Sequence, residues 1–152
     1  MKVFFAVTFS VLLTGCGSMA PSHNDASPPV VINQLTPSFN SEGGTVDVSV
    51  GISNTARLSL KSVQIDLDAY DVSGALLPDA SGRIRFEGPF APGTSVGPTV
   101  FERVWTRSDI RCLEVVSVRT TAMDYSTQSL VGKEANSLVE KNYRRICNAD
   151  SL

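Results

Sequence analysis

Hydrophobic and polar residues alternate along much of this chain from Val30 onward, which is the pattern of strands with one buried face. Segments of this kind cover residues 46–52, 63–69, 83–87, 100–105, 113–123 and 129–131. Clusters of Gly, Pro, Asn and Ser separate them, rather than helical segments. Short strands with such turns are typical of an antiparallel sandwich. The sequence therefore predicts a mainly β, antiparallel β-sandwich over residues 30–150.

The end of the chain follows a different period. One face of a helix would gather Ala135, Leu138, Val139, Asn142, Tyr143 and Ile146. We therefore expect a short C-terminal helix over residues 134–146, with a final strand before Cys147 as the alternative.

The N-terminus carries the pattern of a signal peptide. Lys2 precedes an apolar run over residues 3–13, which is shorter than the roughly 20 apolar residues that span a bilayer. The run ends in Leu13-Thr14-Gly15-Cys16, which resembles the lipobox of bacterial lipoproteins. In that family the cysteine thiol receives a diacylglyceryl group, the chain is cut before it, and the new amino terminus is acylated. The resemblance implies a signal peptide over residues 1–15 and lipidation at Cys16, with an ordinary secretory signal as the alternative.

The residues after Cys16 predict the membrane to which the domain is anchored and its distance from that membrane. In enteric-type bacteria an aspartate after the lipidated cysteine favours the inner membrane, and Gly17 stands there instead. The resemblance thus implies the periplasmic face of the outer membrane, or the cell surface in an organism with one membrane. Residues 16–29 are small, polar and proline-rich, so we expect a flexible tether with a reach of about 20 Å. The membrane is the first expected partner.

Chain length and net charge limit the number of domains and the kinds of partner that this protein can have. A chain of 152 residues, less its signal peptide, holds one domain of ordinary size. Its formal charge is −2, and loss of Lys2 with the signal peptide leaves −3. Mild acidity without a basic stripe argues against nucleic acid as a partner.

The other two cysteines form an even pair in an oxidising compartment. With Cys16 lipidated, Cys112 and Cys147 remain. A disulfide between them would tie the end of the chain to the domain body. Two free thiols or half of a metal site are the alternatives, but no histidine lies near them and no third thiol is left, which disfavours zinc.

The middle of the chain resembles the bacterial FxLYD-type immunoglobulin-like module. Leu67-Asp68-Ala69-Tyr70-Asp71 followed by Gly74 is similar to its strand end, and residues 88–93 are similar to its Pro-Gly turn. The Val- and Thr-rich segment that ends at Asp124 resembles its last strand. The resemblance covers roughly residues 44–126. It implies an extracytoplasmic sandwich and carries no catalytic residue to transfer.

Candidate catalytic and metal motifs have simpler explanations. Residues 93–97 match the Gly-x-Ser-x-Gly string of hydrolases, yet the one histidine, His23, lies in the tether, so we expect a hairpin-type loop there. Asp66 and Asp68 share a strand face that Asp71 does not, so we expect solvated carboxylates rather than a calcium site. We expect no metal or cofactor, and a histidine-free enzyme is the last of the hypotheses.

The best hint of a binding surface is aromatic. Phe101 and Trp105 fall on one side of a strand that is bulky on both sides, so one face is a candidate partner surface, with burial under the tail helix as the alternative. A basic cluster at Lys141, Arg144 and Arg145 is explained by the favourable placement of cations at a helix end. We expect a non-enzymatic lipoprotein that binds another envelope protein. The alternative is a pilotin-like or chaperone-like escort of an outer-membrane or secretion component, which an apolar groove beside the tail would favour.

Overall fold

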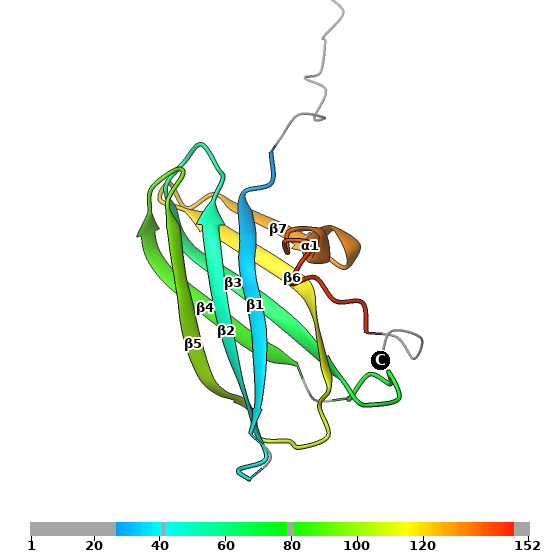
Figure 1. The fold of residues 1–152 in the computed structure, drawn as a ribbon. Helices are drawn as coiled ribbons and strands as arrows, with labels where there is room; N and C mark the ends of the chain where they lie inside the picture. Colours follow the sequence, from blue (N-terminus) through cyan, green and yellow to red (C-terminus); the bar gives the residue numbers. More distant parts are fainter. Residues whose placement is uncertain (1–26, 41, 79–80, 148–152) are drawn as a thin grey trace, which may run out of the picture.

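The strands pair into two antiparallel sheets that face each other (Figure 1). The computed structural model describes residues 27–40, 42–78 and 81–147. Its elements are β1 (Val30–Asn40), β2 (Thr45–Asn54), β3 (Leu60–Tyr70), β4 (Gly82–Phe90), β5 (Ser95–Trp105), β6 (Cys112–Ala122), β7 (Thr127–Val131) and α1 (Lys133–Ser137). One sheet has the order β1-β2-β5 and the other β4-β3-β6-β7. This is an immunoglobulin-like arrangement, and the predicted β-sandwich with a short C-terminal helix is confirmed.

The core lies between the two sheets and is built by the alternation that predicted the strands. Inward side chains of β2 and β3, an interior strand of each sheet, are almost completely buried. They are Val46, Val48, Val50 and Ile52 on one sheet and Val63, Ile65 and Leu67 on the other. β-Branched side chains suit these positions because they fill the pleated surface with few rotamers to lose.

Strand β5 departs from regular alternation near its end. Arg103 has a φ of 52°, and its backbone N–H donates to Oδ1 of Asp47 at 2.7 Å. The register against β2 shifts here, which marks a bulge. Because of the bulge, Val104 and Trp105 both turn inward, whereas simple alternation places them on opposite faces.

The sequence predicted a hairpin-type loop at residues 93–97, and the structure differs from this prediction. The turn is confined to Pro92 and Gly93, and β5 already begins at Ser95. The segment also joins the two sheets, because β4 and β5 belong to different ones. Which sheet a strand enters depends on distant pairing, so a local pattern cannot distinguish a hairpin from a crossover.

The C-terminal helix is shorter than predicted, since α1 ends at Ser137 and not near residue 146. The chain instead pairs with β1: the N–H of Ile32 donates to the carbonyl of Leu138 at 2.9 Å, and that of Glu140 to the carbonyl of Ile32 at 3.0 Å. Two bonds to a sheet edge replace the helical bonds that a continued helix would make. The apolar positions Leu138 and Val139 are buried as predicted, but Ile146 is 64% exposed.

Candidate functional site

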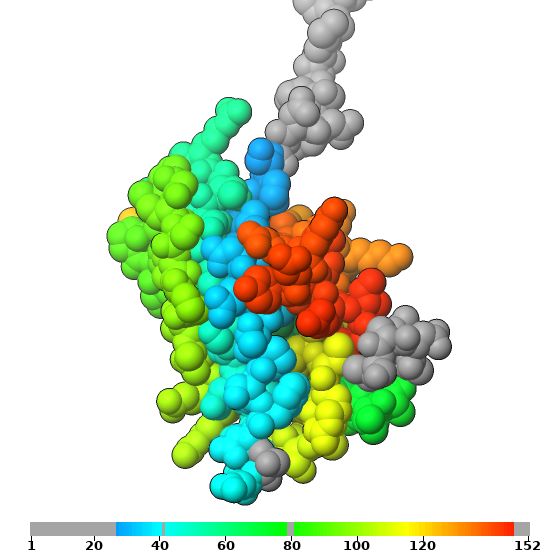
Figure 2. Space-filling model, in the orientation of Figure 1, coloured from blue at the N-terminus to red at the C-terminus, as the bar shows by residue number. Residues whose placement is uncertain are grey.

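A groove lies between β1 and the C-terminal segment of residues 138–147, which we call the tail. Its lining comes from β1 (Leu35, Thr36, Pro37, Phe39), from the start of β6 and the residue before it (Arg111, Cys112, Leu113), and from the tail (Asn142, Tyr143, Arg144, Arg145, Ile146). Figure 2 shows the tail in red between β1 in blue to cyan and β6 in yellow. The groove encloses about 780 Å³, within the range of ligand and peptide sites.

The groove has an apolar interior that reaches the surface. Leu35 and Leu113 are buried at its base, and Tyr143 is half-buried beside them. Phe39 is 42% exposed and Ile146 64% exposed along its length. Large apolar side chains held at the surface of a concave feature are typical of an interaction site.

The tail wall is fixed to the domain by covalent and polar contacts. Cys147 forms a disulfide with Cys112, with Cα atoms 5.8 Å apart, so the predicted pairing is confirmed. The guanidinium of Arg144 donates to the carbonyl of Val139 at 2.8 and 3.1 Å and also to that of Ser137. Asn136 donates its amide to the carbonyl of Arg145 at 3.1 Å. The wall is therefore organised before any partner arrives, which lowers the entropic cost of binding.

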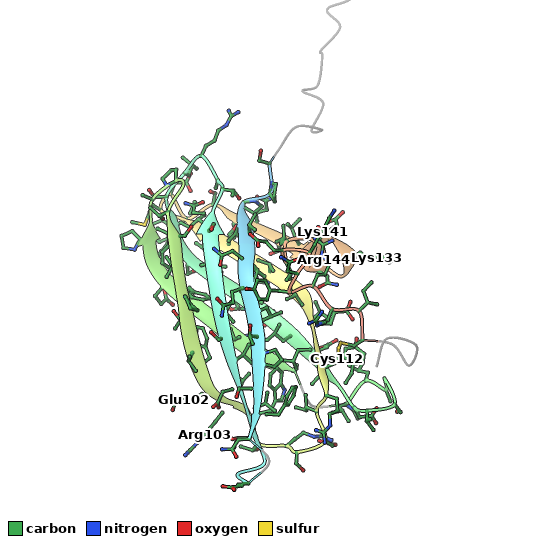
Figure 3. All side chains as sticks on the ribbon, in the orientation of Figure 1. Glu102, Arg103, Cys112, Lys133, Lys141 and Arg144 are labelled. Atoms are coloured by element: carbon green, nitrogen blue, oxygen red, sulfur yellow. A yellow bond between two sulfur atoms is a disulfide. The ribbon has the colours of Figure 1, made fainter. Side chains whose placement is uncertain are left out.

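Cationic groups border the apolar interior. Arg111, Arg144 and Arg145 line the groove, and Figure 3 shows Lys133, Lys141 and Arg144 gathered around α1 and the tail. Arg111 donates to the carbonyls of Ser108 and Ile110 at 2.8 Å, and the carboxylate of Asp109 is close enough to interact with its charge. Within residues 27–40, 42–78 and 81–147, the ion pairs involve other arginines. The groove is thus locally positive in a chain of net negative charge.

Phe101 and Trp105 do not form the predicted partner surface. Trp105 is 6% exposed and belongs to the core between the sheets. Phe101 is half-buried and meets Phe86 of β4 edge to face, with ring centroids 5.2 Å apart. The alternative that these rings are buried was right. The opposite sheet covers them, however, whereas the alternative assigned that role to the tail helix. The other face of the strand carries the exposed Val100.

The aspartates of β3 and of the turn after it do not converge on one site. Asp66 pairs with Nε of Arg83 at 2.8 Å on the sheet surface. Asp71 closes the turn after β3, accepting bonds from the hydroxyl of Ser73 at 2.6 Å and the N–H of Ala75 at 3.0 Å. These bonds, led by that of Ser73, lower the pKa of the Asp71 carboxyl below its usual value. In the part of the chain that the structure describes, no three His, Cys, Asp or Glu residues lie close enough to hold a metal.

Tyr70, at the end of β3, is the aromatic residue of the FxLYD-like segment. Burial raises the pKa of its phenol, and the charges of Glu114 and Asp68 raise it further.

Prolines obstruct strand addition at three of the sheet edges. The edge strands β1, β4 and β5 contain Pro37, Pro89 and Pro98, which have no N–H to donate to an added strand. The fourth edge strand, β7, has only five residues. In the groove, Pro37 therefore favours recognition of a partner's side chains over backbone pairing.

Two predicted positions lie outside the described residues: the lipidation site Cys16 and the tether residue His23. No helix within residues 27–40, 42–78 and 81–147 is long and apolar enough to cross a membrane. A scan against protein-family models and searches of curated proteins and of solved structures find no match to this chain.

Sequence reasoning missed most of the groove. Phe39 and Ile146 stand far apart in the chain and belong to segments of different periodicity, so no local pattern joins them. The only available hint was the predicted disulfide, because it required the tail to return to the start of the 113–123 segment.

Proposed function

We propose that this protein is a lipoprotein anchored in the outer membrane on its periplasmic side, and that its sandwich binds another envelope protein without catalysing a reaction. The lipobox-like residues 13–16 support the anchor. The groove between β1 and the tail is the observation that carries the binding function. The FxLYD resemblance supports the extracytoplasmic location and stays part of the proposal.

The groove's chemistry suggests the kind of partner. An apolar interior that contains Phe39 and Ile146 suits aliphatic or aromatic side chains. The arginines at its border suit carboxylates, which they can hold bidentately. We infer an apolar polypeptide segment flanked by acidic residues. Because the anchor keeps both partners near one membrane, a modest interface suffices.

The available reactive groups support binding over catalysis. His23 is the one histidine of the chain, and it precedes the sandwich. Cys112 and Cys147 are joined in a disulfide, so neither is a nucleophile. An enzyme built on this domain would depend on carboxylates and hydroxyls alone.

Crosslinking in cells tests the groove. A photo-crosslinking residue in place of Thr36, which is exposed on the groove wall, is expected to capture a discrete envelope protein. Phe39→Ser and Arg145→Glu are each expected to lower the yield about five-fold or more, the factor that corresponds to about 1 kcal/mol.

Val100 supplies the matched control, because it is an exposed valine on β5, at the opposite edge of the same sheet. A crosslinker at Val100 is expected to capture nothing from this interface, and Val100→Ser is expected to leave the Thr36 adduct unchanged. Equal capture from both positions, or an adduct insensitive to Phe39→Ser, would show that the groove is not the binding site.

Metabolic labelling tests the anchor. Cells fed radiolabelled palmitate are expected to label the chain, and Cys16→Ala is expected to abolish the label and release the protein from membranes. The physical reason is that acyl chains contribute about 0.8 kcal/mol per buried methylene. Cys112→Ala is the control and should keep its label. Persistence of the label in Cys16→Ala would exclude the lipobox interpretation.

The escort function is the second candidate, and the apolar groove beside the tail favours it specifically. An escort shields an apolar segment of a client until that client reaches the outer membrane. Fractionation after depletion of this protein separates the two proposals. A captured partner that then accumulates in the inner membrane supports the escort, and a partner that keeps its location supports a static binding module.

A further inference from the structure

The chain leaves the sandwich toward Cys16 at a defined end (Figure 1). The carbonyl of Pro29 accepts bonds from the N–H groups of Thr55 at 3.2 Å and Ala56 at 3.1 Å. These bonds fix the start of β1 to the loop between β2 and β3. The turn between β6 and β7 lies at the same end, since the N–H of Met123 donates to the carbonyl of Ser59 at 2.9 Å.

This end carries exposed apolar side chains from two loops. Leu58 is 53%, Met123 51% and Tyr125 72% exposed. Arg57 and Lys61 lie beside them and are also exposed. We call these five residues the tether-end surface.

Tyr125 occupies the left-handed position of the turn between β6 and β7, where its side chain is not one that this conformation favours. Its φ is 67°, in the left-handed region where glycine or asparagine is preferred and a bulky aromatic residue is strained. The side chain projects into solvent, so packing in the core does little to compensate for that strain. Strain kept at an exposed position points to a function for the side chain.

The charges of the surface are arranged around this ring. Nζ of Lys61 lies 4.3 Å from the centroid of the Tyr125 ring, a cation-π contact. The carboxylate of Asp124 is turned to the backbone and hydroxyl of Ser126, at 2.9 and 2.5 Å. Tyrosine with neighbouring lysine and arginine is the combination that settles at a membrane–water interface, with the ring in the headgroup region and the cations near phosphates.

The length of chain before this end sets its distance from the anchor. Ten residues separate Cys16 from Ser27, the first described residue, and their composition predicts a reach of about 17 Å. An 11-residue strand such as β1 spans about 36 Å. The exit end is therefore the part of the sandwich held nearest to the bilayer.

We propose that the tether-end surface rests on the phospholipid bilayer, with Tyr125, Leu58 and Met123 in the headgroup region. This inference rests on the lipidation in the proposed function and adds an orientation to it. Phe39 lies toward the opposite end of β1 from Val30, so docking would turn this part of the groove away from the membrane surface.

Depth-sensitive fluorescence quenching tests the contact. The full-length lipidated chain with Tyr125→Trp is added to vesicles of phosphatidylethanolamine and phosphatidylglycerol, with or without bromine on the acyl chains. Quenching of the added tryptophan and a blue shift of its emission are expected. Val72→Trp is the matched control, because Val72 is 74% exposed in the loop after β3, at the other end. Trp105 is a constant background in both, since it is buried at that other end.

Tyr125→Gly keeps the proposal testable if the aromatic variants fold poorly. Glycine accepts the left-handed conformation, so thermal stability is expected to stay unchanged or rise. In a Leu58→Trp chain, adding Tyr125→Gly is expected to reduce the quenching at position 58. Undiminished quenching there would overturn a role for Tyr125.

The remaining outcomes separate this inference from the proposed function. A chain that carries no acyl group overturns both. A chain that floats with the vesicles but shows no more quenching for Tyr125→Trp than for Val72→Trp overturns the docking alone. The docking is also overturned if a crosslinker at Tyr125 captures a second copy or another protein while the emission stays unquenched.

Discussion

Trp105→Ala is expected to lower the free energy of unfolding by about 3–5 kcal/mol, the usual cost of deleting a buried tryptophan from a core. The sequence suggested that this residue faces a partner, in which case truncation would leave stability unchanged and weaken binding. The structure places it in the core at 6% exposure, so stability is the property that should respond. Urea unfolding of the purified chain carrying Cys16→Ala measures the effect. Val100→Ala, at an exposed position, should shift stability by no more than about 0.5 kcal/mol.

Gly82 provides a second test of the same packing. A Cβ atom added at Gly82 would lie 2.4 Å from Cζ2 and 2.6 Å from Cη2 of Trp105, which is closer than packed atoms approach. Gly82→Ala alone is therefore expected to cost about 1–3 kcal/mol. In a Trp105→Ala background the ring is gone, so the added cost should shrink. Strict additivity of the two substitutions, or wild-type stability of Trp105→Ala, would contradict this packing.

Removing the disulfide by Cys112→Ala with Cys147→Ala is expected to cost about 3–4 kcal/mol, because the bond closes a loop over a sequence separation of 35 residues. The same unfolding experiment measures the loss. Reduction of the wild-type chain should reproduce it and change its mobility in gels.

The disulfide should also matter for the groove, since it holds the tail wall in place. The double alanine variant is expected to give less of the Thr36 adduct under conditions where it remains folded. Arg144→Ala serves as a comparison, because it releases the carbonyls of Ser137 and Val139 but keeps the disulfide. An unfolding midpoint that does not change on reduction would show that the bond contributes nothing to stability.

The strands were predictable because their cause is local. Alternation at Val46, Val48 and Val50 already separates a buried face from an exposed one, and a turn at Gly43 and Gly44 precedes it. The helix prediction failed beyond Ser137 for the opposite reason. Leu138 and Val139 were correctly assigned to the interior and Ile146 was not, and hydrogen bonds to Ile32, which lies far earlier in the chain, decided the backbone conformation here.

The aromatic surface failed for a similar reason. Phe101 and Trp105 share a face in both the prediction and the structure, although the bulge at Arg103 also turns Val104 to that face. Whether that face is covered depends on where β4 lies, and Phe86 of β4 covers Phe101. Strand order across two sheets follows from long-range pairing, which no window of neighbouring residues contains.

The sequence by itself determined the strand segments and the β class, because side-chain alternation is a property of the chain, and it favoured a disulfide between Cys112 and Cys147 over free thiols. It also supplied the lipobox-like motif on which the proposed anchor rests. Tertiary structure alone decided which element covers each buried face, where the tail returns to β1, and that Phe39, Arg111 and Ile146 line one groove. The physical reason is that these features arise from contacts between residues far apart in the chain, whose energies depend on the fold as a whole.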